Sequence, residues 1–267
     1  MTLFQAIVLG VVQGLTELLP VSSSAHLTLT PYFLGWPDPG LAFDVALHLG
    51  TLVALIWYFR HEWIEMTASA WNIVRTRRIE TVHDKRLVYL IVATIPGGIG
   101  GLLLNDYAES TFRSPALIAS TLLVMGVLLW AVDKWSARAR AIEEITMRDA
   151  LLVGCAQVLA LIPGVSRSGS TITAGRALQL DRPSAARFSF LMSMPITFAA
   201  VVLKVPHAIR AEGLSVPLVA GVVAAAISSL FAITVLLRYV SKHSFGVFAL
   251  YRVALAFAVF ATIAYRR

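Results

Sequence analysis

Residues 17–26 read Glu-Leu-Leu-Pro-Val-Ser-Ser-Ser-Ala-His, and residues 161–171 read Leu-Ile-Pro-Gly-Val-Ser-Arg-Ser-Gly-Ser-Thr. Each stretch follows an apolar run that is too short to cross a bilayer, and proline then interrupts the run. A backbone that is broken at membrane depth must be buried in protein or line a wet cavity, because lipid cannot satisfy its hydrogen bonds. Paired broken segments in the two halves of a membrane protein predict a site near the membrane midplane.

The two stretches belong to a longer internal similarity. Residues 6–27 align with residues 150–171 at an offset of 144. The identical pairs are Ala6/Ala150, Gly10/Gly154, Gln13/Gln157, Leu15/Leu159, Val21/Val165, Ser22/Ser166 and Ser24/Ser168. This similarity predicts that the chain contains two related halves.

The composition identifies an integral membrane protein. The chain has 267 residues, of which 58% are hydrophobic and 14% are charged, with a mean hydropathy of +0.77. A soluble domain carries about one-quarter charged residues. The net charge of +7 would suggest nucleic acid in a soluble chain. Here the basic residues lie mostly in short loops and set orientation, so we expect no nucleic-acid partner. The single cysteine, Cys155, excludes an internal disulfide.

The apolar segments predict an all-α polytopic membrane protein with about six transmembrane helices plus two re-entrant helical hairpins. The predicted spans are 41–59, 87–104, 115–132, 184–203, 214–237 and 246–265. The descending arms of the hairpins are 4–19 and 148–162, and the returning arms are 22–34 and 166–180. Glycines and Pro96 within 87–104 could kink or break that span.

The count of spans predicts an inverted-topology repeat within a single membrane domain, 1–267. Repeat one, about 1–140, and repeat two, about 145–267, each contain one hairpin and three spans. Three is odd, so the second half enters the membrane upside down relative to the first. Basic residues cluster in the loop at 60–86 and in the connection at 134–148, which we expect to be cytoplasmic. The first hairpin then enters from the outer face.

Glu17 and Arg167 are the charges deepest in apolar surroundings, and a charge at membrane depth is costly enough to indicate function. The alternative is a structural ion pair between the hairpins. The turn around Arg167 is rich in glycine and hydroxyl groups and opens a helix, which favours an anion such as phosphate. Its glycines alone would also fit close helix packing.

The first hairpin carries a second polar cluster. Gln13 and Glu17 are four residues apart and face the same side of a helix, and Ser22, Ser23, Ser24 and His26 follow in one loop. Carboxylate, hydroxyl and imidazole together can supply a nucleophile, its base and a metal ligand. Asp44 and His48 could join this site, but we place them at the outer interface. Arg176, Asp181 and Arg182 are interpreted as ordinary charges at helix ends.

These residues carry a resemblance to a known family. The run from Gln13 to His26 resembles the glutamate-rich signature of the bacitracin-resistance type undecaprenyl-diphosphate phosphatases. The run from Pro163 to Thr171 resembles that family's second signature, Pro-Gly-x-Ser-Arg-Ser-x-x-Thr. The resemblance covers essentially the whole chain in order and spacing. Gln13 departs from it, since many members carry a second glutamate there.

The resemblance implies hydrolysis of undecaprenyl diphosphate to undecaprenyl phosphate and inorganic phosphate, which recycles the lipid carrier for peptidoglycan synthesis. It implies a multi-pass protein of the bacterial plasma (inner) membrane whose cavity faces the outer, periplasmic side. A homodimer is left open. The expected substrate-binding residues are Ser22, Gly164, Ser166, Arg167, Ser168, Gly169 and Thr171. Glu17, with Gln13, is expected to hold a divalent cation, Mg²⁺ or alternatively Ca²⁺.

Several alternatives stay open at the level of the sequence. Ser23 is the preferred nucleophile with His26 as its base, while direct attack by His26 or by metal-activated water are the competing mechanisms. The second function that the repeat permits is transport, that is, flipping of a phosphorylated polyprenyl lipid. An ion channel is a poorer interpretation, because few polar positions could form a ring-like filter.

Overall fold

The structure, a computed structural model, describes residues 1–103 and 114–266. This part of the chain is helical throughout, with a single isolated bridge between Arg140 and Leu180. Five helices are long and apolar enough to cross a membrane, and a bent helix pair raises the number to six. The fold class expected from the sequence is therefore confirmed, while the division into two inverted repeats stays a prediction.

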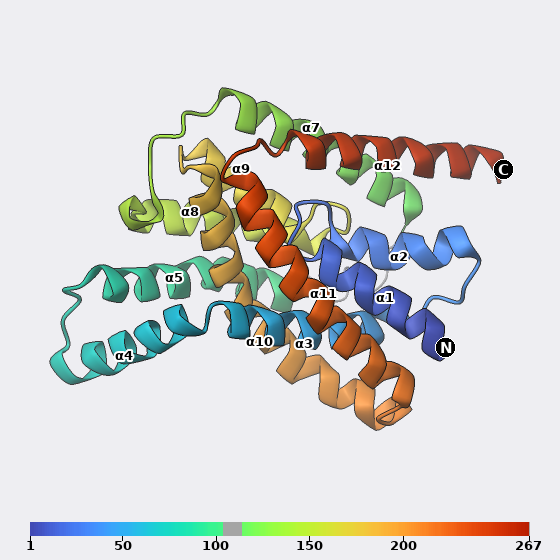
Figure 1. Cartoon of the computed structure of the whole chain (residues 1–267), viewed down its shortest axis with the longest axis horizontal. Helices are drawn as coiled ribbons and strands as arrows, with labels where there is room; N and C mark the ends of the chain where they lie inside the picture. The colour runs from blue at the N-terminus through green and yellow to red at the C-terminus, as the bar shows by residue number, and fades with distance from the viewer. Residues whose placement is uncertain (104–113, 267) are drawn as a thin grey trace.

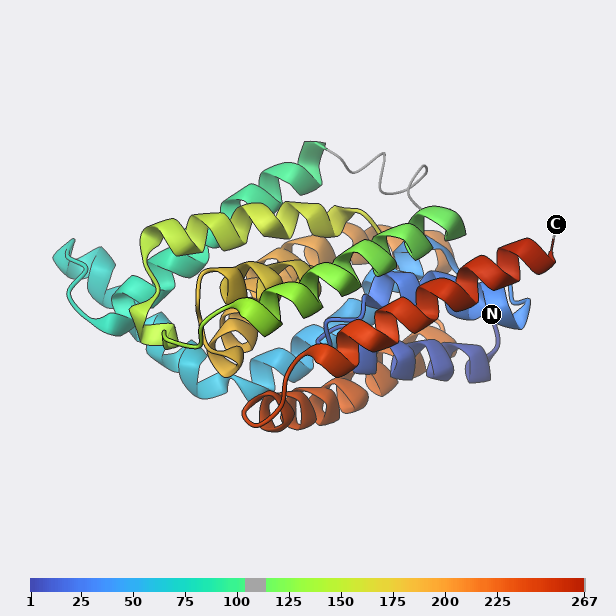
Figure 2. The same cartoon turned by 90° about the horizontal axis from the view of Figure 1, so that it is seen from above.

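The helices follow the predicted segments closely. Their bounds are α1 Leu3–Thr16, α2 Ser23–Leu34, α3 Gly40–Tyr58, α4 Arg60–Thr76, α5 Val82–Leu103, α7 Pro115–Trp135, α8 Met147–Val158, α9 Arg167–Ala177, α10 Arg182–Glu212, α11 Val216–Val240 and α12 Gly246–Tyr265. Two short 3₁₀ helices, η2 Ile142–Glu144 and η3 Leu159–Leu161, flank α8. Both chain termini lie at one end of the molecule and α4 lies at the other (Figures 1 and 2).

Two helical hairpins form the centre of the molecule. The first consists of α1 and α2, and the second consists of α8, η3 and α9, so both predicted pairs of arms are present. Their turns meet near the middle of the fold (Figure 1), where the Ser168 hydroxyl donates to the Leu19 carbonyl at 2.9 Å. The meeting of the two turns buries polar residues from both halves of the chain in one place.

Glycine brings α1 into close contact with α11. A Cβ at Gly10 would lie 2.2 Å from the Gly221 carbonyl oxygen, and one at Gly14 would lie 2.0 Å from the Ser228 hydroxyl. Small residues let helix backbones approach closely in membranes, where van der Waals packing replaces the hydrophobic effect between helices. The glycines on α1 therefore fix the position of the helix that leads into Glu17.

The region after α3 differs from the prediction of a loop. Residues Arg60–Thr76 form α4, which bends away from α3 by 79° at Phe59. Phe59 is 1% exposed and its amide still donates to the Leu55 carbonyl at 2.9 Å, so the bend is packed into the core. By contrast, α5 runs without interruption through Pro96, and the break considered there does not occur.

Arg176 and Arg182 are not the exposed helix-end charges that the sequence suggested. Both are buried, and both donate to the carboxylate of Asp133 on α7, at 2.9 and 2.8 Å. The Phe245 amide completes this cluster with a 3.0 Å hydrogen bond to the same carboxylate. Buried charges survive only when they are paired and hydrogen-bonded, and this cluster ties α7, α9, α10 and the start of α12 together.

Candidate functional site

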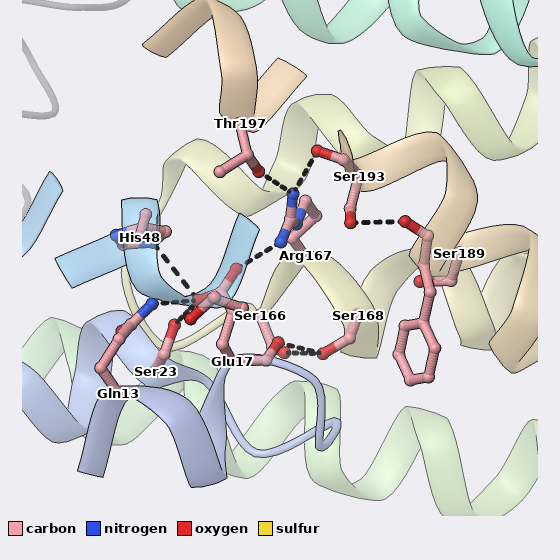
Figure 3. A network of polar contacts seen from close by, with 12 residues as sticks. Gln13, Glu17, Ser23, His48, Ser166, Arg167, Ser168, Ser189, Ser193 and Thr197 are labelled. Atoms are coloured by element: carbon pink, nitrogen blue, oxygen red, sulfur yellow. Dashed lines mark hydrogen bonds and ion pairs between the residues drawn. The ribbon is translucent and has the colours of Figure 1, made fainter. Parts of the chain in front are cut away.

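Glu17 and Arg167 form an ion pair across the junction of the two hairpins (Figure 3). The Arg167 guanidinium donates through Nη2 to Glu17 Oε1, although the two residues are 150 positions apart in the chain. Through Nη1 it donates to the Ser193 carbonyl at 2.9 Å and to the Thr197 hydroxyl at 2.7 Å. Helix α10 thus fixes one edge of the guanidinium, while the other edge faces the carboxylate.

The other oxygen of Glu17 gathers three donors. Ser23 donates its hydroxyl to Oε2, Gln13 donates Nε2 at 3.1 Å, and His48 Nε2 lies 3.3 Å away. Oε2 is thus crowded by three groups, whereas Oε1 faces the Arg167 guanidinium and keeps further acceptor capacity. Glu17 is therefore the hub of the site and is itself 6% exposed.

His48 reaches this site from α3, and this corrects our placement of His48 at an outer interface. Its Nδ1 lies 2.7 Å from the Asp44 carbonyl oxygen, which can only accept a hydrogen bond. Its Nε2 faces the Glu17 carboxylate, which also accepts when it is ionised. Both ring nitrogens therefore face oxygen atoms that accept hydrogen bonds, an environment that suits the doubly protonated imidazole.

The charges of the site favour an anion. One carboxylate, Glu17, faces two cations, Arg167 and His48, so the three groups together carry one net positive charge. Such a cluster in a largely buried setting attracts a negatively charged group more strongly than it would in bulk water. The planar guanidinium adds a fork that matches phosphate oxygens.

The two hairpin turns are built alike. Ser22 and Ser166, which are equivalent in the internal alignment, cap α2 and α9 with φ of 74° and 73°. Each side chain accepts from the backbone amide three residues on and contacts the serine two residues on, Ser24 or Ser168, at 3.2 and 3.1 Å. Positive φ at serine costs about 1–3 kcal/mol and persists where surrounding structure enforces it, often at functional sites.

Arg252 on α12 holds both turns. Its guanidinium is fully buried and donates to the carbonyl oxygens of Pro20, Gly164 and Val165 at 3.1, 2.7 and 3.0 Å. A Cβ at Gly169 would lie 2.6 Å from its Nη1, so only glycine leaves room for this contact. Arg252 thereby fixes the first turn relative to the second, and hence Glu17 relative to Arg167.

A cavity of about 240 Å³ opens beside the ion pair. Its polar lining comes from both hairpins and from α3 and α10, and its apolar wall comes from α3, η3 and α10. The lining residues are Glu17, Ser23, Ser24, Val45, His48, Gly97, Gln157, Ala160, Leu161, Ser166, Arg167, Ile196, Thr197 and Ala200. Polar and apolar surfaces therefore meet in one chamber.

Some of the expected phosphate ligands are used inside the protein instead. The Ser168 hydroxyl bonds to the first hairpin, and the Thr171 hydroxyl donates to the Arg167 carbonyl at 2.8 Å. The Gly164 carbonyl oxygen accepts a hydrogen bond from Arg252, and the Gly169 amide donates to the Ser166 hydroxyl at 3.0 Å. With Ser22, these residues build the turns and do not line the cavity, whereas Ser166 and Arg167 do.

His26 lies outside the cavity lining. Its Nδ1 is 2.7 Å from the Ser22 carbonyl oxygen, and its Nε2 is 2.7 Å from the Tyr251 hydroxyl, with the two rings stacked. Both ring nitrogens thus have hydrogen-bond partners, one at the N-cap of α2 and one on α12. Within the described residues, Ser23 bonds to Glu17 and not to His26.

Three polar residues of the cavity were not assigned from the sequence. These are His48, Thr197 and Gln157. The equivalence of Gln157 with Gln13 was a usable signal for the third, because Gln13 was already a candidate. Thr197 carries no such signal, since it belongs to an apolar span and lies outside both signature stretches.

The residues expected to hold a divalent cation are partly suited to it. In the described ranges no group of three or more His, Cys, Asp or Glu side chains is placed to hold a metal ion. Gln13 Oε1 is buried without a hydrogen-bond partner there, which leaves one amide oxygen beside the Glu17 carboxylate. Mg²⁺ is usually bound by one or two carboxylates together with substrate phosphates, so the pair fits an ion that arrives with its substrate.

The fold and the cavity define a class, the polytopic membrane proteins with a polar, charged cavity between two helical hairpins. Comparison with known sequences then gives the family. The chain belongs to the family described as "Bacitracin resistance protein BacA", whose sequence model matches residues 6–258.

Curated relatives match along the whole chain. One from Gemmatimonas aurantiaca, named undecaprenyl-diphosphatase, is 77% identical over 266 residues, which is 100% of both chains. Another of that name, from Moorella thermoacetica, is 49% identical over 100% of both chains. A third, undecaprenyl-diphosphatase 2 from Stutzerimonas stutzeri, is 49% identical over 96% of both.

Proposed function

We propose that this protein hydrolyses undecaprenyl diphosphate to undecaprenyl phosphate and inorganic phosphate. The observation that carries the proposal is the cluster of Glu17, Ser23 and Arg167 in one cavity, which places a guanidinium beside a hydroxyl that donates to a carboxylate. Membership of the family and the names of the full-length relatives support the same activity. Hydrolysis recycles the lipid carrier used in cell-wall synthesis, and this accords with bacitracin resistance in the family name.

The substrate would bind with its diphosphate against Arg167. The guanidinium releases Glu17 and turns its free edge to the phosphoryl oxygens, while Ser193 and Thr197 keep its other edge in place. The hydroxyls of Ser24 and Ser166 line the same space. The polyprenyl chain then follows the apolar wall of the cavity outward between the helices.

Ser23 is the proposed nucleophile and Glu17 its base. The Ser23 hydroxyl already donates to Glu17 Oε2, so its proton has an acceptor in place. The Ser23 oxygen forms a bond to the terminal phosphorus, and the bond from that phosphorus to the bridging oxygen breaks. Undecaprenyl phosphate leaves, and water then releases inorganic phosphate from the serine.

The two competing attacking groups, His26 and water, differ in what they require of the site. Direct attack by His26 would require the imidazole to leave Tyr251 and the Ser22 carbonyl oxygen, which occupy both of its nitrogens. Water activated beside Glu17 needs no such movement and is the closer competitor. With Ser23 or water as the attacking group, His26 acts on position, because it anchors the first turn to α12.

A divalent cation, Mg²⁺ or Ca²⁺, would be held by Glu17 and by Gln13 Oε1 together with the substrate. Bound there, it would neutralise charge on the diphosphate as the leaving group departs. We place the protein in the bacterial plasma membrane with the cavity facing outward, because basic residues cluster in the connections at 60–86 and 134–148.

The test is release of phosphate by the purified protein from undecaprenyl diphosphate, with and without a chelator. We expect one inorganic phosphate for each undecaprenyl phosphate formed, and a loss of rate in the chelator. Movement of intact lipid diphosphate across proteoliposomes without any phosphate release would overturn the proposal in favour of a flippase. A rate that is unchanged in the chelator would show that the reaction needs no divalent cation, and the cation would be dropped from the proposed function.

A further inference from the structure

Gln157 is a buried amide in the cavity with no protein partner among the residues that the structure describes. It is 4% exposed, and both its Nε2 and its Oε1 are buried without a hydrogen bond. It lines the same chamber as Glu17 and Arg167. A buried amide without partners is costly, and native structures keep one only where something else compensates.

The internal repeat explains why this amide has no protein partner among the described residues. Gln13, its equivalent, donates to Glu17 four residues later at 3.1 Å. In the second half the residue four positions after Gln157 is Leu161, which has no acceptor. The geometry of the first half is thus repeated without the carboxylate, and Leu161 also lines the cavity. The place of the missing acceptor opens onto the chamber.

Helix α5 is shaped to admit this side chain. A Cβ at Gly97 would lie 2.4 Å from Gln157 Nε2 and 3.1 Å from its Cδ, so any larger residue would displace the amide from this position. At the neighbouring Gly98 a Cβ would meet nothing within 4 Å. Close packing of α5 against α8 would account for the glycine at position 97 but not for the polar side chain at position 157. An apolar residue at position 157 would pack there without leaving buried polar atoms unsatisfied.

We propose that Gln157 is a substrate ligand whose Nε2 donates to a non-bridging oxygen of the bound diphosphate. The proposal rests on the proposed function and names a further contact in the same site. The diphosphate supplies the anionic acceptor that Glu17 supplies to Gln13 in the first half. Gln157 and Arg167 then hold the diphosphate from α8 and α9, on two sides of one turn.

The first test replaces Gln157 with methionine, which keeps length and flexibility but has no amide. We expect kcat/KM for undecaprenyl diphosphate to fall about 10- to 100-fold, as for loss of a hydrogen bond to a charged group. The inhibition constant of methylenediphosphonate, a diphosphate that cannot be hydrolysed, should rise by a similar factor. The melting temperature in detergent should stay equal or rise, because an unsatisfied buried amide is removed.

The second test moves the amide without removing it. Gly97→Ala should lower kcat/KM and weaken inhibition by methylenediphosphonate, whereas the matched Gly98→Ala variant should behave as wild type. In a Gln157→Ala background the added methyl group meets no amide. In that background Gly97→Ala should reduce kcat/KM little further. Such non-additivity would show that Gly97→Ala acts through the amide of Gln157.

The outcomes separate this inference from the proposed function. If wild-type protein releases no phosphate from undecaprenyl diphosphate, the proposed function fails first. If it does, but Gln157→Met stays within twofold of wild type, Gln157 is no ligand. A loss of activity with a lower melting temperature and an unchanged inhibition constant would likewise overturn the proposal, because it marks a structural role.

Discussion

Replacing Glu17 by glutamine should abolish turnover and, at the same time, tighten the binding of a diphosphate. The amide keeps the shape of the carboxylate but cannot take the proton of Ser23, so the activation of that hydroxyl is lost. Removal of an activated nucleophile or its base costs about 10⁴–10⁶ in kcat in enzymes where this has been measured. We therefore expect a loss of at least about 10³-fold.

The gain in binding follows from the charges that Glu17 neutralises. His48 Nε2 lies 3.3 Å from the carboxylate, a Coulomb attraction of about 5 kcal/mol at an effective dielectric constant of 20. The Arg167 guanidinium is held by the same carboxylate. An anion entering the wild-type cavity must compete with Glu17 for both cations. If only about 1.4 kcal/mol of this attraction becomes available to the ligand, pyrophosphate binds about tenfold more tightly.

The assay is phosphate release together with titration of pyrophosphate by calorimetry, the latter in a chelator so that no metal contributes. Glu62→Gln is the matched control, since Glu62 pairs with Arg187 away from the cavity and should leave both quantities within twofold. Turnover of Glu17→Gln within tenfold of wild type would remove Glu17 from the chemistry. Weaker pyrophosphate binding in the chelator would refute the competition for Arg167 and His48.

Three further changes test the site and the topology. Arg167→Lys should lose most activity, about 10²-fold or more in kcat/KM, because the three donors of an ammonium share one nitrogen and cannot reproduce the planar fork that spans Thr197 and two phosphoryl oxygens; near-normal turnover would make the arginine a structural counter-ion. Ser23→Ala should cost more than about 10³-fold and Ser24→Ala far less in phosphate release, since Ser23 donates to Glu17 whereas Ser24, among the described residues, contacts a neighbouring serine; equal small losses would favour water as the attacking group. Cysteines at residues 39 and 78, in a background without the native cysteine, should label from opposite faces of intact cells, residue 39 from outside. Labelling from one side would contradict the predicted orientation.

The sequence alone was sufficient for the two hairpins and for every α-helix of the described residues except α4. Continuous apolar runs and their lengths determine spans in a membrane, because lipid requires every backbone hydrogen bond to be satisfied within a helix. For the same reason the proline- and serine-rich interruptions at 17–26 and 161–171 could only be turns buried in protein. Glu17 and Arg167 stood out because a lone charge at that depth is costly. The signal failed at α4, whose amphipathic sequence has low hydropathy and was interpreted as a loop.

The partners of each side chain were decided only by the tertiary structure. Hairpin packing, through Gly10 and Gly14 against α11, brings the end of α1 beside α3, and this places His48 on Glu17. The same packing leaves His26 against Tyr251 on α12, although His26 is closer to Glu17 in the sequence.

Separation along the chain does not predict these contacts. Each contact depends on how helices that are distant in the sequence rotate and cross when they pack together. Gln157 is the clearest case. The sequence shows its kinship with Gln13, but only packing against Gly97 shows that its amide lies buried in the cavity and without a partner in the described part of the chain.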